Sequence, residues 1–191
     1  MTKRQKKKLI QLIVGSLLLL GSFLYSKYQP VAQAPVTQAG YYNVSRFDDG
    51  DTIVVDMNGV DEKIRFIGVD TPETHDPRKP VQCFGKAASE FTKNLIGNNP
   101  VRLESDPTNT NRDRYNRLLR YVYLPDGTLV NLEIIKQGYG FAYLSFPVQK
   151  AEEFRLAQKT ARENEKGLWS ACDPEKNEYG GFSSPPEKTN L

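Results

Sequence analysis

Residues 52–70 read TIVVDMNGVDEKIRFIGVD, and the prediction of the fold starts from this segment. Its first part, residues 52–57, is rich in β-branched side chains, which favour strands. Asn58-Gly59 follows, a pair typical of a two-residue hairpin turn. Residues 63–69 then follow as the partner strand. The stretch therefore predicts a β-hairpin.

The sequence on either side of this hairpin predicts three more strands and three helices. Alternating side chains indicate the strands, and apolar residues at helical spacing indicate the helices. The strands are expected at 42–47, 101–104 and 118–124, and the helices at 84–96, 129–137 and 149–165. Strands that are grouped in this way, instead of alternating with helices, argue against a parallel α/β sheet. We predict an α+β, mainly β fold: a five-stranded barrel with three packed helices.

The N-terminal residues 1–25 predict a segment for membrane targeting. Five basic residues precede residue 9, and residues 9–25 are uncharged and almost wholly apolar. This pattern is typical of a signal peptide or of a membrane anchor whose basic end is cytoplasmic. We favour an uncleaved anchor, because the one usable cleavage site, after Ala39, lies far from the apolar run. In either case the main domain is expected outside the cytoplasm.

The rest of the chain divides into a linker, one domain and a tail. Residues 26–40 resemble a flexible linker rich in Pro, Ala and Gln, and 41–172 contain every predicted element. Residues 173–191 are expected to be a disordered tail, because they combine Gly-Gly, Ser-Ser-Pro-Pro and several charges. No internal repeat is visible, and a monomer without an obligate protein partner is the default expectation.

Charge does not predict nucleic-acid binding on its own. The net charge of +3 depends on the basic residues before residue 9, and the remaining chain is slightly acidic. Any anionic substrate of the domain must therefore be held by locally placed arginines, because no broad basic surface is available.

The sequence contains two cysteines, Cys83 and Cys172. An oxidising compartment permits a disulfide between them, and an even number of cysteines outside the cell favours one. The alternative is two separate buried thiols.

Two carboxylates are expected to meet at one end of the predicted hairpin. Asp51 begins one strand and Asp70 ends its partner, so the turn at Asn58-Gly59 brings them together. Carboxylates that approach one another repel unless a cation or proton lies between them. Oxygen ligands suit Ca²⁺ or Mg²⁺, and His75 is the only histidine, which argues against zinc. Asp49 is a further carboxylate beside this site, although an ordinary polar turn is the alternative.

Other charged residues could act on a phosphodiester. Glu73 follows Asp70 across Pro72, at a position where a carboxylate could deprotonate attacking water. Arg65 and Arg117 could bind phosphate oxygens through paired hydrogen bonds, which strengthen as charge develops in the transition state. Taken singly, each of these residues could equally be a solvated surface charge.

Four motifs together resemble the staphylococcal nuclease (thermonuclease) family, and the resemblance covers about residues 41–172. The segment Asp-Thr-Pro-Glu is specific in this context, whereas Asp-Gly-Asp alone is not. The motifs are Asp-Gly-Asp-Thr at 49–52, Arg65 followed by Asp-Thr-Pro-Glu-Thr at 70–74, Asp-Arg-Tyr-Asn-Arg at 113–117 and Gly-Leu-Trp-Ser at 167–170.

The resemblance implies an OB-fold barrel with three helices and calcium-dependent hydrolysis of DNA or RNA, with single strands the expected preference. It also implies a role for each residue that matches the family's motifs. Catalysis would depend on Arg65, Glu73 and Arg117. Ca²⁺ would bind Asp51, Asp70 and the carbonyl group of Thr71, with Asp49 nearby, and the nucleotide would contact Arg114, Tyr115 and Tyr143.

One departure from the family pattern lies at Asn116, where glycine is usual before the second arginine. Asparagine also tolerates a left-handed backbone, so the turn is expected to survive. Two other functions stay open: a non-catalytic nucleic-acid-binding or protein-binding OB-fold module, and a small-molecule or cell-envelope binding domain. Non-catalytic modules of this family usually lack the acidic residues or the arginines, whereas this chain keeps them.

Overall fold

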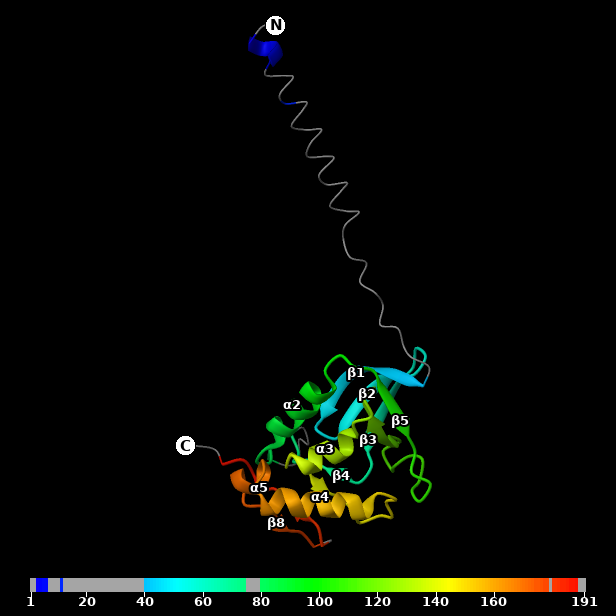
Figure 1. Cartoon of the computed structure of the whole chain (residues 1–191), viewed down its shortest axis with the longest axis vertical. Coiled ribbons are helices and arrows are strands. Elements are labelled where there is room, and N and C mark those ends of the chain that lie inside the picture. The colour runs from blue at the N-terminus through cyan, green and yellow to red at the C-terminus, as the bar shows by residue number, and fades with distance from the viewer. Residues whose placement is uncertain (1–2, 7–10, 12–39, 75–79, 179, 189–191) are drawn as a thin grey trace. The chain divides into compact units, whose positions relative to one another are not determined.

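The computed structural model describes residues 3–6, 11, 40–74, 80–178 and 180–188. Five strands close into a barrel in the order β1-β2-β3-β6-β5. The predicted mainly β barrel with packed helices is confirmed (Figure 1). The strands of the barrel are β1 (Tyr41–Asp49), β2 (Thr52–Asp56), β3 (Asp61–Phe66), β5 (Val101–Glu104) and β6 (Leu118–Tyr123).

The predicted apolar segment and linker lie almost wholly outside the described residues. Only residue 11 of 9–25, and residue 40 of the linker, are described. Within the described parts of the chain, no helix is both long and apolar enough to cross a membrane. By its contacts the chain divides into the units Met1–Val36 and Thr37–Leu191, and the fold below belongs to the second.

The hairpin of β2 and β3 forms as its sequence predicts. The strands pair antiparallel, with Ile53 opposite Ile64 and Thr52 opposite Arg65. Asn58 and Gly59 both have positive φ angles, of 60° and 85°, which is the backbone that a tight hairpin turn requires. β3 then pairs in parallel with β6, and β1 pairs with both β2 and β5, which closes the barrel.

The second predicted strand of this hairpin is too long. β3 ends at Phe66, and Gly68 adopts a left-handed φ of 71°, which a strand cannot continue. A Cβ on Gly68 would lie 2.6 Å from the ring of Phe154, so the chain turns here against α4. The next residues form β4 (Val69–Asp70), which leaves the barrel and pairs with β7 (Phe141–Ala142). Asp70 therefore belongs to a separate two-stranded sheet and not to the barrel.

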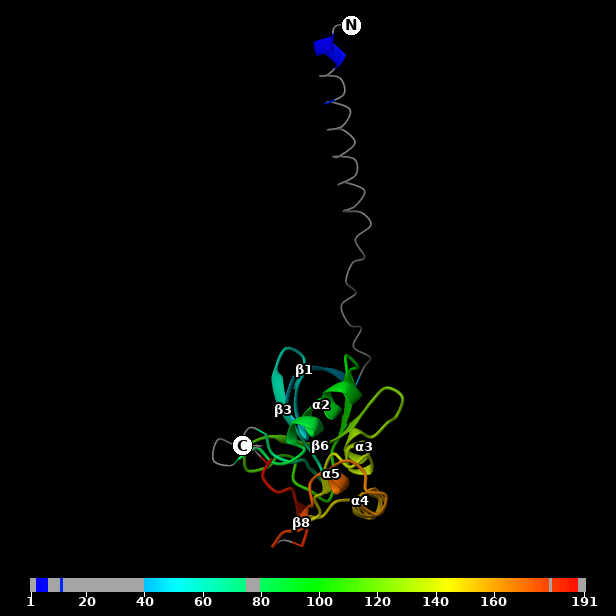
Figure 2. The same cartoon turned by 90° about the vertical axis from the view of Figure 1, so that its left-hand side faces the viewer.

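The three predicted helices are present as α2 (Gly85–Ile96), α3 (Val130–Lys136) and α4 (Ala151–Glu163), and a short helix α5 (Leu168–Ala171) follows. In Figures 1 and 2, α2 lies beside the barrel, and α3 lies between the barrel and α4. The buried Asn131 anchors α3 to the barrel, because its side chain accepts a hydrogen bond from Val122 N–H and donates to Ile67 O.

The core fills the barrel and the space beneath α3 and α4. Ile53, Ile64, Phe66 and Tyr121 are almost completely buried, and Phe154 of α4 meets Tyr121 edge to face at 6.2 Å. Burial of each such large side chain contributes about 1.5–3 kcal/mol to folding.

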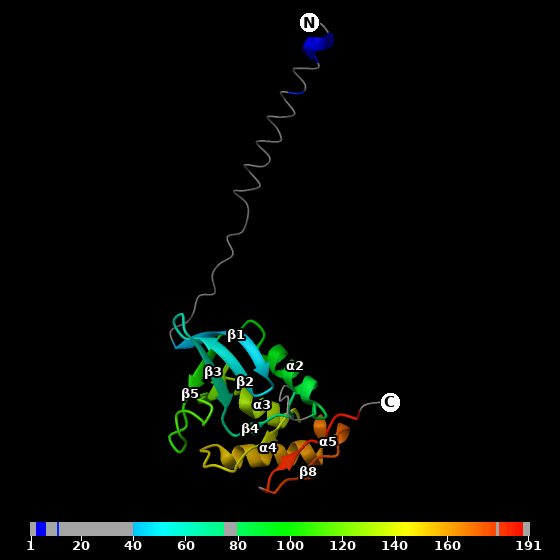
Figure 3. The same ribbon diagram turned by 180° about the vertical axis from the view of Figure 1, so that it is seen from behind.

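The prediction of a disordered tail at 173–191 is wrong for the part that is described. β8 (Glu175–Lys176) and β9 (Phe182–Ser183) form a hairpin, and the chain continues from it past α5 (Figure 3). The Phe182 ring packs edge to face against Trp169 at 5.0 Å and lies near Phe141. Composition alone does not indicate this contact, because one partly buried ring can fix a segment that is otherwise polar.

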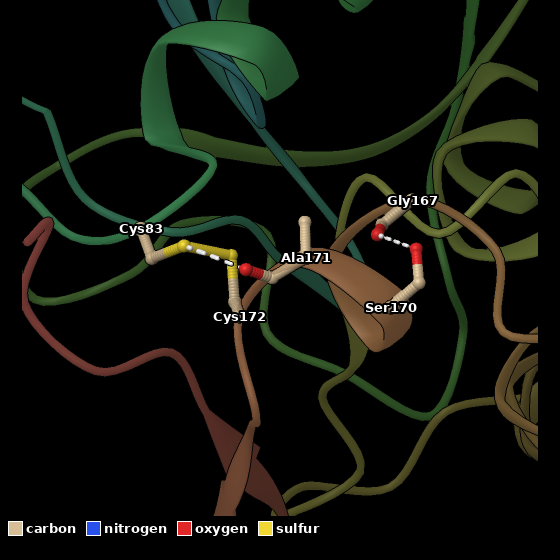
Figure 4. Close-up of a disulfide and its surroundings, with 5 residues drawn as sticks. All are labelled: Cys83, Gly167, Ser170, Ala171 and Cys172. Atoms are coloured by element: carbon tan, nitrogen blue, oxygen red, sulfur yellow. Dashed lines mark hydrogen bonds between the residues drawn. A yellow bond between two sulfur atoms is a disulfide. The ribbon is translucent and has the colours of Figure 1, made fainter.

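A disulfide joins Cys83, just before α2, to Cys172, just after α5 (Figure 4). No free cysteine is left in the chain. The bond spans 89 residues, and closing so long a loop contributes about 4–5 kcal/mol in the chain-entropy description. It ties the end of α5 to the start of α2.

Asp106 is a buried carboxylate at which the loop after β5 meets the barrel and the start of α4. It accepts hydrogen bonds from Tyr121 Oη at 2.5 Å, Gln149 N–H at 2.8 Å and Thr108 N–H at 2.8 Å. Burial raises the pKa of Asp106, but these hydrogen bonds outweigh it and hold the pKa below its ordinary value.

We predict that Asp106→Asn lowers the free energy of unfolding at pH 7 by about 1–3 kcal/mol. Because the pKa of Asp106 is lower in the folded state, its contribution is present above the unfolded pKa and is lost as pH falls through the folded pKa. The difference between the two proteins should therefore shrink below about pH 4. Urea unfolding from pH 2 to 7 measures it, with the exposed Asp61→Asn as control. A difference that does not depend on pH would contradict this account.

Candidate active site

The Asp49-Gly50-Asp51 turn is held between α2 and the segment after β4. Thr92 of α2 donates a hydrogen bond to Gly50 O at 2.6 Å. A Cβ on Gly50 would lie 2.8 Å from Thr71 Oγ1, so the two segments pack this closely only with glycine here. The turn is thus fixed by tertiary contacts, which its sequence does not show.

Asp51 is buried and accepts hydrogen bonds at both carboxylate oxygens. Thr52 Oγ1 donates to one oxygen at 2.9 Å, and Thr71 N–H donates to the other at 2.9 Å. The latter oxygen also lies 2.7 Å from Arg65 Nη1. Asp51 thereby connects the start of β2 to the residue that follows β4.

Arg65 of β3 lies between the two carboxylates that the sequence predicts to meet. One guanidinium nitrogen contacts Asp51, and the other contacts Asp70 Oδ1 at 2.8 Å. The first nitrogen also donates to Val69 O at 2.7 Å. The predicted approach of Asp51 and Asp70 is therefore observed, but through a route that the sequence analysis missed: the turn at Gly68 and a shared arginine.

Carboxylates outnumber cations at this end of the barrel. Asp49 accepts hydrogen bonds from Gly50 N–H and from Thr74 Oγ1 at 3.0 Å. Burial, together with the negative charges of Asp51 and Glu73, raises the pKa of Asp49 to about 6. Asp49, Asp51 and Asp70 all lie near the guanidinium group of Arg65, so three carboxylates surround one positive charge and this region favours a further cation.

Glu73 lies on the segment between β4 and α2, and its backbone is held on both sides by Gln82. Glu73 N–H donates to Gln82 Oε1 at 2.8 Å, and Gln82 N–H donates to Glu73 O at 2.9 Å. The Glu73 carboxylate accepts from Thr74 N–H at 3.0 Å.

Asp113 holds Arg117 in place. Arg117 Nε contacts Asp113 Oδ2 at 2.7 Å, and the backbone N–H groups of Arg117 and Tyr115 donate to Oδ1. Asn116 has a φ of 64°, the left-handed backbone that the sequence analysis expected it to tolerate. Burial raises the pKa of Asp113, but the hydrogen bonds from Arg117 outweigh it and keep the pKa below its ordinary value.

A cleft of about 1290 Å³ gathers most of the predicted residues. Residues without a predicted role also line it, among them Lys63 and the ion pair of Glu62 and Arg112 at 2.9 Å. Asp70 and Tyr143 are not part of the lining, although Asp70 contacts it through Arg65. The predicted residues that do line the cleft are Asp49, Asp51, Arg65, Thr71, Glu73, Arg114, Tyr115 and Arg117.

The aromatic residues predicted to meet a nucleotide are both exposed. Tyr115 is 59% exposed, with Arg114 4.8 Å and Arg117 5.4 Å from its ring centre. Tyr143 is 39% exposed and lies beside the exposed Phe146, with ring centres 6.0 Å apart. The cleft thus contains one of the two tyrosines.

The residues present fit a hard cation. Within 40–74, 80–178 and 180–188, no three His, Cys, Asp or Glu side chains form a ready metal cluster. The predicted set needs only two carboxylates and one carbonyl group, with water completing the shell. The buried Thr71 Oγ1 has no hydrogen-bond partner among the described atoms, so a further oxygen faces this region.

Two residues that organise the site were missed. Asp113 stands in a quoted motif, but it was given no role, although an acidic residue four positions before an arginine suggests an ion pair. No sequence pattern indicates a role for Gln82, because its partner Glu73 is nine residues away and their contact depends on the fold.

Comparison with known proteins identifies the class to which this fold and site belong. A family profile described as "Staphylococcal nuclease homologue" matches residues 63–171. The chain belongs to the staphylococcal nuclease family, as its motifs indicated. The enzyme class expected from those motifs, a nuclease, agrees with the names of the individual relatives.

Two relatives are thermonucleases. The Thermonuclease of Staphylococcus hyicus is 40% identical over 162 residues, which is 83% of this chain and 94% of that protein. The Thermonuclease of Staphylococcus intermedius is 45% identical over 132 residues, which is 67% of this chain and 75% of that protein. Endonuclease YncB of Bacillus subtilis (strain 168) is 40% identical over 129 residues, 66% of this chain and 60% of that protein.

We predict that Asp113→Ala destabilises the fold by about 1–3 kcal/mol, because charge-assisted hydrogen bonds to Arg117 and its loop are lost. Urea unfolding at pH 7 measures the change. Asp126→Ala is the matched control, because this exposed turn residue bonds only to Thr128. Equal stabilities of the two variants would contradict the role given to Asp113.

Proposed function

We propose that the protein is a calcium-dependent nuclease that hydrolyses phosphodiester bonds of DNA or RNA by attack of water. The observation that carries this proposal is one cleft lined by Asp51, Glu73, Arg65 and Arg117. This reaction requires a carboxylate that binds the cation, a second carboxylate that deprotonates the water, and two guanidinium groups that bind the phosphate.

The residues of the chain divide the work by their chemistry. Asp51, Asp70 and the carbonyl group of Thr71 would hold Ca²⁺, which when bound lowers the pKa of water and offsets the charge of the phosphate. Glu73 takes a proton from the attacking water. Arg117, whose Nε is paired with Asp113, can present its other nitrogens to the phosphate.

Arg65 must exchange partners during this reaction. Its nitrogens pair with Asp51 and Asp70, both of which are the proposed ligands of the cation. A bound cation would neutralise these carboxylates and weaken their hold on Arg65. The guanidinium group could then turn to a phosphate in the cleft, which would link binding of the cation to binding of the substrate.

Single-stranded substrates are the proposed preference. The exposed rings of Tyr115 and Tyr143 can stack only on bases that are not paired in a duplex, and Arg114 lies beside the first ring. Base stacking is tolerant of sequence, so little sequence specificity is expected.

Cleavage of single-stranded DNA by the full chain, with Ca²⁺ or with EGTA, tests this function. We expect cleavage only with Ca²⁺, and we expect Glu73→Gln and Arg117→Ala each to lower kcat by at least about 100-fold, since each removes one transition-state contact. Glu133→Gln on α3 and Arg155→Ala on α4 are matched controls, because their ion pairs lie on the helices outside the cleft.

The alternative is a non-catalytic module that binds nucleic acid or protein. It predicts no cleavage under any metal condition, together with binding of single-stranded DNA that does not respond to EGTA. Near-normal kcat in both site variants would contradict the assigned roles even if the wild-type protein cleaves.

We also propose that the folded domain lies outside the cytoplasm, tethered by residues 9–25 or released from them. The disulfide supports this location, since such bonds persist in oxidising compartments. We predict that the domain stays with the cell membrane after expression and that its N-terminal segment is retained, as mass spectrometry can show. A soluble product that begins at Gly40 would show cleavage and contradict the tether.

A further inference from the structure

A short strap from the C-terminal region lies alongside the segment that precedes α2. We call residues 184–187 the C-terminal strap. Cys83 N–H donates to Pro185 O at 2.8 Å, and Glu187 N–H donates to Val81 O at 2.8 Å. Pro186 forms a β-bridge with Gln82 between these two bonds. In Figure 3 the strap runs from the β8–β9 hairpin past α5 toward the start of α2.

The disulfide fixes the same segment from its other end. Cys83 is bonded to the buried Cys172 at the end of α5 (Figure 4). The next residue, Phe84, has a φ of 71°, which costs energy for a bulky side chain and persists only where the surroundings impose it. The strap and the disulfide together provide that constraint.

This constrained segment bears on Glu73. Gln82 brackets the Glu73 backbone with two hydrogen bonds, one from its side chain and one from its own N–H. α2 adds a close contact, since a Cβ on Gly85 would lie 3.0 Å from Glu73 O and 2.7 Å from Thr74 Cγ2. The backbone of Glu73 therefore takes its position from residues 82–85, and its carboxylate projects from that backbone into the cleft.

We propose that Gln82 is a positioning residue for Glu73, and that the strap and the disulfide hold Gln82 in place. The proposal rests on the proposed function, in which Glu73 deprotonates water. A general base acts only within hydrogen-bond reach of its proton, so a small displacement of Glu73 slows the chemical step. Binding of the phosphate depends instead on Arg65 and Arg117, so affinity for the substrate should change little.

The first test is Gln82→Met, which keeps the length of the side chain and removes the oxygen that accepts from Glu73 N–H. We expect kcat with Ca²⁺ and single-stranded DNA to fall about tenfold, with KM within about twofold of wild type, because misplacement of a catalytic group acts on the reaction step. Gln137→Met is the matched control, since Gln137 bonds to Glu133 on α3. Thermal unfolding confirms that each variant is folded.

A second measurement does not depend on activity. Hydrogen exchange of the Glu73 amide should become faster in Gln82→Met and should stay protected in Gln82→Glu, which retains an acceptor oxygen at the same place. A role limited to filling space would give the same exchange in both variants.

The contribution of the disulfide is tested by Cys83→Ser combined with Cys172→Ser. We expect this double variant to lower kcat and to speed exchange of the Glu73 amide. If both effects act through Glu73, adding Gln82→Met should lower kcat less than the product of the separate effects.

The outcomes separate the two proposals. If the wild-type protein cleaves and Gln82→Met retains wild-type kcat or amide exchange, the positioning role is wrong and the proposed function stands. If the wild-type protein cleaves no nucleic acid, the proposed function fails, and the positioning role fails with it whatever the exchange rates. If the loss of kcat in the combined variant equals the product of the losses from Gln82→Met and from the two cysteine substitutions, the disulfide does not act through Glu73.

Discussion

The arrangement of the site depends on one guanidinium group between two carboxylates. Arg65 reaches Asp51 through one nitrogen and Asp70 through the other, although Asp51 lies in the turn before β2 and Asp70 lies in β4, outside the barrel. Arg65 and Asp51 are largely buried, and buried charges are tolerated only when they are paired. The bond from Arg65 to the half-exposed Asp70 joins β4 to this pair. The negative charges of Asp49, Asp51 and Asp70 around this guanidinium group then make this the part of the site that favours a further cation.

The C-terminal region of the chain also contributes to the arrangement of the site. The strap and the disulfide add no side chain to the cleft, yet they bind residues 81–83, and Gln82 in turn bonds to the backbone of Glu73. Chemistry at the cleft is thereby connected to a region about a hundred residues later in the chain. The connection runs through the backbone hydrogen bonds of the strap, the disulfide and the side chain of Gln82.

The sequence predicted most of the barrel, because local rules govern its elements. Asn58-Gly59 between β-branched runs specifies a hairpin, and apolar spacing specifies α2 and α4. It failed at Gly68, where a left-handed residue ends β3 because Phe154 lies against it, a contact between residues far apart in sequence. The prediction from sequence was also wrong for the tail. Composition suggested disorder there, whereas the ring of Phe182 packs against Trp169.

The sequence by itself determined which chemical groups are available: the acids of the Asp-Gly-Asp turn and the Asp-Thr-Pro-Glu segment, two arginines, and two cysteines. It also determined the family, because those groups occur in a specific order and spacing. Only the tertiary structure decided which groups meet. Asp70 joins Asp51 through Arg65, Arg117 is held by Asp113, and Glu73 is held by Gln82. Such contacts depend on the closure of the barrel and on packing between distant segments, and neither leaves a local pattern in the chain.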